Sequence, residues 1–323
     1  MKVKFLIIVV VISLFCGSVF AQNKVKEQES VLKTEKCKIY GTLKVPTTKE
    51  KVPVALFIAG SGATDRNCNQ LPQMVCNSFK MLSDSLNKYG IATLCYDKRL
   101  IAKSVSKQTE DELRFEHYVE DAKGWIDLLS QDSRFSEVIV FGHSEGSLIG
   151  MIAYANNPKV SKYISIAGAG VSADEILKEQ LLNQLAGNQG FKNQIWHYID
   201  ELKQGNLLEN VPQNLYVFFR PSVQPYMISW FKYNPQEEIA KLNIPVLILQ
   251  GSMDIQVSEE EAELLYEGNP TAKKVIIQNM NHVLKNSEST DMSEQVKDSY
   301  NNPKSPVNKE LVEELVEFCK TAF

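Results

Sequence analysis

One short stretch of the sequence combines residue types that could carry out hydrolysis through a serine nucleophile. Ser144 lies in the sequence GHSEG (142–146), directly after the apolar run 138–141 and before a helical pattern of apolar residues. A G-x-S-x-G sequence between a strand and a helix predicts a nucleophile elbow, whose sharp turn exposes the serine above the end of a sheet. A glycine-flanked loop without chemistry is less favoured, because the motif stands in the context that the elbow requires.

A serine hydroxyl becomes a useful nucleophile only beside a base, which a third group must orient. His282 fits the base best, because it follows the strand predicted over 274–277 and the histidine comes last in the chain order of such sites. The other three histidines are predicted to have packing or surface roles: His143 beside the elbow, His117 on the polar face of a helix, and His197 in a helical insertion.

The orienting acid should lie between the serine and the histidine in sequence. Asp254 follows the predicted strand 246–249 and a glycine, so its loop should lie beside the loop of His282. Asp174, which follows the preceding strand, is the rival. We therefore predict a triad of Ser144, Asp254 and His282.

Acyl transfer also needs hydrogen-bond donors for the developing oxyanion, and these are usually backbone N–H groups. One donor should be Glu145, the residue after the nucleophile. The other should come from the glycine-containing loop after the apolar strand 54–58, with Ser61 preferred and Gly62 second. A simple tight turn at this loop stays open as an alternative.

The elements that must position these residues alternate along the chain. Predicted strands at 54–58, 91–96, 163–167, 246–249 and 274–277 are separated by amphipathic helices, which indicates parallel βαβ units. Residues 31–45 predict two short strands around Gly41. The segment 171–241 breaks this rhythm, is helical in pattern and rich in aromatic residues, and predicts a cap. A long polar loop over 285–307 precedes a final amphipathic helix.

Composition narrows the classes of function. The 323 residues are 44% hydrophobic, which suits one catalytic domain with an inserted cap. A net charge of -4 and a pI near 5.7 provide no broad basic surface, so no nucleic-acid partner is expected. No His/Cys cluster has metal-ligand spacing, so we expect no metal site, and the proposed chemistry needs no cofactor.

The N-terminus has the basic, apolar and small-residue regions of a signal peptide, predicted to be cleaved between Ala21 and Gln22. An uncleaved membrane anchor is disfavoured by the short apolar run, and a lipidated Cys16 is disfavoured by the bulky residue before it. The protein is therefore expected to be exported, periplasmic or secreted, with no stable membrane insertion after cleavage. In that setting Cys68 and Cys76 could form a disulfide, although buried free thiols are at least as well supported.

The strand order, GHSEG, the strand ending in GSMD (251–254) and the Asn-His pair after the last strand together resemble the α/β-hydrolase superfamily over nearly the whole mature chain. The sequences GSG (60–62), DRN (65–67), YDKR (96–99) and RPSVQPY (220–226) resemble secreted bacterial hydrolases of the carboxylesterase-like or serine-aminopeptidase-like type. Those relatives have a glycine-rich turn after Asp-Lys-Arg, where this chain has Leu-Ile-Ala.

The resemblance implies an α/β-hydrolase fold with a mostly parallel central sheet, helices on both faces and a helical cap insertion. The expected domains are a signal peptide (1–21), the α/β-hydrolase core (22–170 and 242–323) and the cap (171–241). The resemblance also implies the same triad.

Three functions follow from these residues. The favoured one is a serine hydrolase that cleaves small or medium carboxylic esters, with a small-molecule ester as partner. The alternatives are a serine peptidase on short peptides, in which Glu145 would help to bind an amino terminus, and a non-catalytic binding protein with the same fold. Arg66 and Arg220 could recognise a substrate carboxylate, which is a minority interpretation. Oligomeric state is not predicted.

Overall fold

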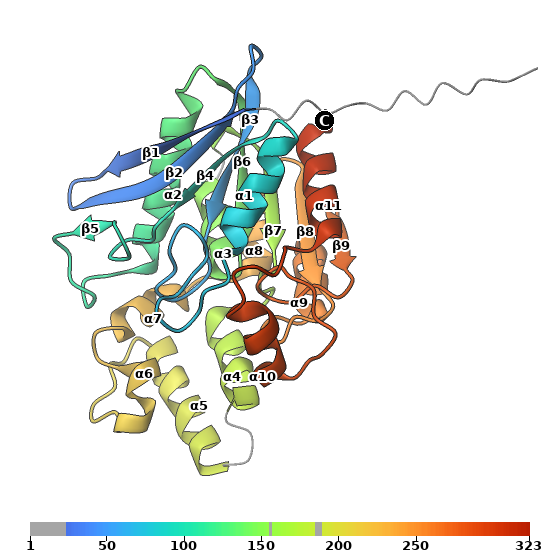
Figure 1. The fold of residues 1–323 in the computed structure, drawn as a ribbon. Coiled ribbons are helices and arrows are strands. Elements are labelled where there is room, and N and C mark those ends of the chain that lie inside the picture. Colours follow the sequence, from blue (N-terminus) through green and yellow to red (C-terminus); the bar gives the residue numbers. More distant parts are fainter. Residues whose placement is uncertain (1–23, 155–156, 185–188) are drawn as a thin grey trace, which may run out of the picture.

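The computed structural model describes residues 24–154, 157–184 and 189–323. The described residues form one nine-stranded sheet in the order β1-β2-β4-β3-β6-β7-β8-β9, with the short β5 paired to β2 (Figure 1). Strands β4 to β9 along this order are parallel, whereas β1 and β2 are antiparallel to their neighbours. The strands are β1 (Val25–Lys33), β2 (Cys37–Pro46), β3 (Val52–Ile58), β4 (Ala92–Tyr96), β5 (Val105–Ser106), β6 (Phe135–His143), β7 (Val160–Ile166), β8 (Val246–Gly251) and β9 (Lys273–Ile277).

Helices connect the parallel strands and fill the segment between β7 and β8. The helices that connect strands or close the chain are α1 (Ser78–Lys88), α2 (Phe115–Ser130), α3 (Glu145–Tyr154), α9 (Glu259–Gly268) and α11 (Lys309–Lys320). Between β7 and β8 lie α4 (Ala173–Gln184), α5 (Gln189–Lys203), the 3₁₀ turn η1 (Gln213–Leu215), α6 (Tyr216–Phe219), α7 (Gln224–Trp230) and α8 (Pro235–Ile239). After β9 come α10 (Met292–Gln295) and the π-helical turn η2 (Val296–Tyr300).

The sheet is buried on both faces, as the unbroken apolar runs of its central strands predict. In β3, Leu56 and Ile58 pack on the side of α2 and α3, while the alternate residue Phe57 packs on the side of α1 and α11. Successive side chains of a strand point to opposite faces, so a strand covered on both sides must be apolar throughout. This layering holds the loops at the carboxyl ends of the strands in fixed positions.

Of the helices between β7 and β8, α8 packs against α3 and α9, whereas α4 to α7 lie beyond the carboxyl ends of the parallel strands (Figure 1). They are tied to the core through Phe115 at the start of α2. The ring of Phe115 stacks on Trp230 with centroids 6.2 Å apart, and its N–H donates to Ser229 Oγ at 2.8 Å. The buried apolar cluster beneath α2 and α3 therefore continues into this helical segment.

Two predictions about local structure are wrong. Gly41 does not separate two strands: the β1–β2 hairpin turns at 34–36, and Gly41 lies inside β2, paired with Tyr96 of β4. A Cβ built on Gly41 would lie 3.0 Å from the Cys95 carbonyl oxygen, so the glycine serves close strand packing. The polar segment 285–307 is also not a plain loop, because it contains α10 and η2.

Other predictions concern the ends of the chain and the cysteines. The predicted signal peptide and its cleavage site lie outside the described residues. No helix in the described ranges is long and apolar enough to cross a membrane. Cys68 and Cys76 are buried free thiols, like the other three cysteines after Cys16, so the structure contains no bond between them.

Candidate active site

The turn between β6 and α3 holds Ser144 in a left-handed backbone conformation with φ of 54°. Non-glycine residues rarely adopt this conformation, and here the flanking elements fix it. The Ser144 N–H donates to the Ile166 carbonyl of β7 at 3.0 Å, and its carbonyl accepts from the Ser147 N–H at 2.9 Å. The serine therefore stands at the sharp turn that the sequence predicts.

The two glycines of the motif are required by contact between neighbouring backbones. A Cβ built on Gly142 would lie 2.4 Å from the Gly146 carbonyl oxygen, and one built on Gly146 would lie 2.2 Å from the Ile58 carbonyl oxygen. Real Cβ atoms do not come so close to backbone atoms. A side chain at position 142 would clash with the start of α3, and one at position 146 would push the elbow away from β3.

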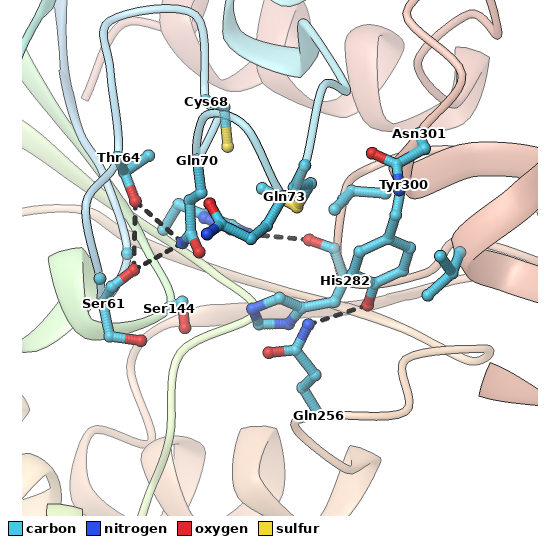
Figure 2. A pocket seen from close by; sticks show the side chains of 16 residues that line it. Ser61, Thr64, Cys68, Gln70, Gln73, Ser144, Gln256, His282, Tyr300 and Asn301 are labelled. Atoms are coloured by element: carbon cyan, nitrogen blue, oxygen red, sulfur yellow. Dashed lines mark hydrogen bonds between the residues drawn. The ribbon is translucent and has the colours of Figure 1, made fainter. Parts of the chain in front are cut away.

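The structure brings the predicted acid and base together at the carboxyl ends of β8 and β9. The Nδ1 atom of His282 lies 2.8 Å from Oδ2 of Asp254, and both side chains are almost fully buried. His282 and Ser144 line the same cavity, and the imidazole ring points toward the serine (Figure 2). All three predicted triad residues thus meet at one place.

Asp254 is held by groups of its own loop. Its Oδ1 accepts from the backbone N–H groups of Gln256 and Val257 at 2.8 and 3.0 Å, and Gln250 Nε2 donates to Oδ2 at 3.2 Å. These bonds fix the carboxylate in line with the imidazole. The rival Asp174 instead pairs with Lys203 at 2.5 Å on the helices between β7 and β8.

His143 has a packing role, as the sequence predicts. Its Nε2 donates to the carbonyl oxygen of His282 at 2.9 Å, and the two rings lie 4.9 Å apart. His143 therefore supports the loop that carries the proposed base, as a packed and hydrogen-bonded neighbour. It also lines the cavity of Ser144.

Burial, reinforced by the nearby His282, lowers the pKa of His143 to about 3. The unfolded chain has the ordinary histidine pKa near 6.5, so between these values the unfolded state binds a proton that the folded state does not. Stability due to neutral His143 is therefore complete above about pH 6.5 and declines as the pH falls. Between pH 7.5 and 5.0 we expect urea unfolding to show a loss of about 2 kcal/mol that the His143→Gln variant lacks. Equal losses in the two proteins would contradict this assignment.

The loop after β3 lies directly against the nucleophile. A Cβ on Gly60 would be 2.9 Å from the Ser144 Cβ, and Ser61 lines two cavities that both contain Ser144. Glu145 is the first residue of α3, so its N–H has no acceptor within the helix. The two predicted oxyanion donors, Ser61 and Glu145, therefore lie on either side of Ser144.

A buried ion pair that sequence reasoning missed joins these two donor positions. Lys98 Nζ lies 2.7 Å from Glu145 Oε2 and donates to the Gly60 carbonyl oxygen at 3.0 Å. Tyr226 of α7 donates to the other Glu145 carboxylate oxygen. The only signal in the sequence was the Asp-Lys-Arg run at 97–99, which gave no indication of its partners.

The residues around Lys98 keep their shape without the glycine-rich turn of similar proteins. Leu100 and Ala102 have φ values of 71° and 48°, a conformation that glycine adopts more easily. Asp97 anchors the loop by accepting from Arg66 at 2.6 and 3.0 Å. Arg66 is therefore engaged within the protein, and Arg220 is likewise paired with Glu110, so neither is free for a substrate carboxylate.

No group of three or more acidic, histidine or cysteine side chains that could hold a metal occurs within residues 24–154, 157–184 and 189–323.

The sheet order, the elbow and the positions of the acid and base define the class of this protein. The chain has the α/β-hydrolase fold, and its sequence is similar to members of that superfamily. Residues 74–207 match the family model described as serine aminopeptidase, S33.

Similar proteins have been named as esterases. Esterase EstD of Thermotoga maritima is 25% identical over 251 residues, covering 76% of this chain, which spans only 57% of the length of that relative. Among solved structures, Est1E from Butyrivibrio proteoclasticus with bound ferulic acid has a TM-score of 0.59 at 18% identity, covering 90% of this chain and 96% of that one. The Pyrococcus furiosus esterase Pf2001 has a TM-score of 0.59 at 16% identity, covering 91% and 90%.

Proposed function

We propose that this protein is a carboxylesterase that works through an acyl-enzyme on Ser144. The observation that carries this proposal is the pair of Asp254 and His282, 2.8 Å apart, in the same cavity as a serine on a nucleophile elbow. A relative named as an esterase supports the reaction class. No cofactor takes part in the proposed steps.

In the first step Ser144 Oγ attacks the ester carbonyl carbon while His282 takes the hydroxyl proton. The tetrahedral intermediate collapses, the bond to the alcohol oxygen breaks, and His282 returns the proton to that oxygen. Water then attacks the acyl-enzyme with the same histidine as base, which releases the carboxylic acid and regenerates Ser144. Asp254 orients His282 and stabilises its charged form.

Lys98 is proposed to position both oxyanion donors. The Gly60–Ser61 peptide is trans, so its N–H points opposite to the carbonyl that Lys98 holds. Binding the carbonyl therefore fixes the direction of the Ser61 N–H. The Glu145 carboxylate on the same ammonium fixes the start of α3, where the second N–H lies.

We call the contacts of Lys98 with the Gly60 carbonyl and the Glu145 carboxylate the Lys98 clamp. Loss of this clamp should lower kcat more than it weakens substrate binding. Lys98→Met alone would leave a buried carboxylate unpaired, so the double variant Lys98→Met with Glu145→Gln removes both charges. We expect kcat for 4-nitrophenyl acetate to fall about a hundredfold with little change in KM, because oxyanion donors act on the transition state. Lys162→Met is the control, since Lys162 is equally buried but binds Glu137 and the Cys319 carbonyl. A folded double variant with normal kcat would refute the clamp.

A serine peptidase is the second candidate, because the matched family model carries the description of an aminopeptidase. Against it, Glu145 is buried and already paired with Lys98 and Tyr226, so it is not available to bind an amino terminus.

A fluorophosphonate probe should label Ser144 in the folded protein, and absence of labelling would favour a non-catalytic binding protein. Comparison of 4-nitrophenyl esters with aminoacyl anilides separates the enzymes: faster turnover of anilides would favour the peptidase.

We also propose that the protein is exported after cleavage between Ala21 and Gln22. The support is the sequence pattern of residues 1–21 alone. Mass spectrometry of the protein recovered from outside the cytoplasm should give Gln22 as the N-terminal residue. An intact Met1 in that fraction would contradict the cleavage.

A further inference from the structure

Two cavities of different size and polarity meet at Ser144. The larger one, which we call the polar cavity, has a volume of about 510 Å³ and contains His282. The smaller one, the apolar cavity, has a volume of about 30 Å³ and lies on the side of Glu145 and α3. If the proposed esterase reaction occurs here, each cavity must take a different half of the ester.

The position of His282 indicates which cavity takes the alcohol part of the ester and which takes the acyl part. His282 must deliver a proton to the leaving alcohol oxygen, so the alcohol lies on the His282 side, in the polar cavity. The oxyanion points toward the backbone donors. The remaining substituent of the carbonyl carbon, which is the acyl chain, is left with the apolar cavity.

The apolar cavity is too small for a long acyl chain. Its volume is less than a tenth of that of the polar cavity. Most side chains around it are apolar and come from α3, the loop after β7, α4 and α7: Leu148, Ala169, Val171, Ala173, Ile176 and Trp230. Glu145 and Gln180 also line it. A short acyl group such as acetyl therefore suits this cavity better than a long chain.

The polar cavity is lined by neutral groups, which include the apolar Met74, Val283 and Val296 and six side chains that can form hydrogen bonds. These six are Thr64, Gln70, Gln73, Gln256, Tyr300 and Asn301 (Figure 2). Among the described lining residues there is no Asp, Glu, Lys or Arg. Its volume lies within the ~300–1,000 Å³ typical of small-molecule sites. A charged alcohol would find no counter-ion in this cavity, and burial of an unpaired charge is costly.

The lining offers both donors and acceptors. Gln256 Nε2 donates to the Tyr300 hydroxyl at 2.9 Å, which leaves the Tyr300 proton and the Gln256 carbonyl oxygen for a ligand. Asn301 Oδ1 accepts from the Val75 N–H at 3.0 Å, which leaves its amide protons. A hydroxyl group is both donor and acceptor, so several hydroxyls on one ring match such a lining. An apolar alcohol would instead leave these groups unpaired.

We propose that the substrate is an O-acetyl ester of a neutral carbohydrate, with the acetyl group in the apolar cavity and the sugar ring in the polar cavity. This inference depends on the esterase function proposed above. The reaction is the acyl transfer already described, with a sugar hydroxyl as leaving group and acetate as the second product.

The test compares three acetates with the purified protein by following acetate release. A monoacetylated methyl xylopyranoside should be hydrolysed with a kcat/KM at least about tenfold higher than cyclohexyl acetate, after division by their alkaline hydrolysis rates. The activated ester 4-nitrophenyl acetate reports whether any esterase activity exists. If it is not hydrolysed, the proposed function fails. If it is hydrolysed but cyclohexyl acetate matches the xylopyranoside, only the carbohydrate inference fails.

The acyl side is tested with 4-nitrophenyl butyrate. We expect at least about a tenfold lower kcat/KM than for the acetate, because two further methylene groups exceed the apolar cavity. A butyrate hydrolysed as fast as the acetate would overturn the assignment of the acetyl group.

A variant at Tyr300 tests whether this residue contacts the sugar ring. Tyr300→Phe removes one hydroxyl from the polar cavity and should lower kcat/KM for the xylopyranoside by about fivefold more than for cyclohexyl acetate. Tyr216→Phe is the matched control, because Tyr216 lies exposed on α6 and does not line either cavity. Equal losses on both acetates with Tyr300→Phe would contradict the proposed sugar contact.

Discussion

Ser144→Ala should lower kcat for 4-nitrophenyl acetate by a factor on the order of 10⁴ to 10⁶, with KM changed much less. Removal of the hydroxyl abolishes the acyl-enzyme route, so only slow hydrolysis supported by binding and oxyanion donors remains. The elbow is held by the Ser144 backbone, whose N–H binds the Ile166 carbonyl, and alanine retains that bond. The measurement is steady-state kinetics together with loss of fluorophosphonate labelling.

Ser147→Ala is the matched control for this experiment. Ser147 lies on α3 one turn after the nucleophile, and its hydroxyl contacts Tyr163 and Ser165 at 2.9 and 2.7 Å. It touches none of the proposed reacting atoms, so kcat should stay within about threefold once the variant is shown to be folded, as for substitutions that lose a buried hydrogen bond but no catalytic group. A Ser144→Ala protein with most of its activity would refute the nucleophile and with it the proposed mechanism.

Asp254→Asn should lower kcat by about 10⁴ while leaving the fold intact. The Asp254 carboxylate accepts both from its own loop and from His282 Nδ1. An amide of the same shape retains part of this geometry but presents the wrong partner to the imidazole. The histidine would then be held in the tautomer that cannot act as base. Steady-state kinetics and a thermal unfolding curve for the same preparation distinguish this effect from unfolding.

Asp174→Asn decides between the two acids that the sequence offered. Asp174 binds Lys203 and has no contact with His282 in the described part of the chain, so its loss should change stability more than kcat. The expected kcat is within about threefold of wild type, because a residue outside the site makes no contact that strengthens in the transition state. If Asp174→Asn were the inactive variant and Asp254→Asn the active one, our assignment of the acid would be wrong.

The sequence determined those parts of the site that depend on local geometry. GHSEG between an apolar strand and a helix gave Ser144, because this local pattern is typical of a nucleophile elbow, and Gly142 is required by a backbone contact within the turn itself. Asp254 and His282 followed from chain order, since the carboxyl ends of parallel strands meet at one edge of the sheet. Strand and helix positions in the core followed from apolar periodicity.

Gly41 shows where local reasoning fails. A glycine between polar and apolar residues predicts a turn, but the contact that requires it comes from Cys95, more than fifty residues later in the chain. The buried pair of Lys98 and Glu145 was missed for the same reason. Each residue has the local sequence of an ordinary surface charge, and only the fold places Lys98 Nζ 2.7 Å from Glu145 Oε2.

From the sequence alone we therefore predicted the α/β-hydrolase fold, the elbow and the three residues of the proposed triad. Only the tertiary structure decided how the elbow is supported and how much space surrounds it. The polar cavity combines residues near position 70 with Gln256, Tyr300 and Asn301, and the apolar cavity combines α3 with α4 and α7. The size and polarity of a cavity depend on the distances between such segments, and no local pattern encodes those distances.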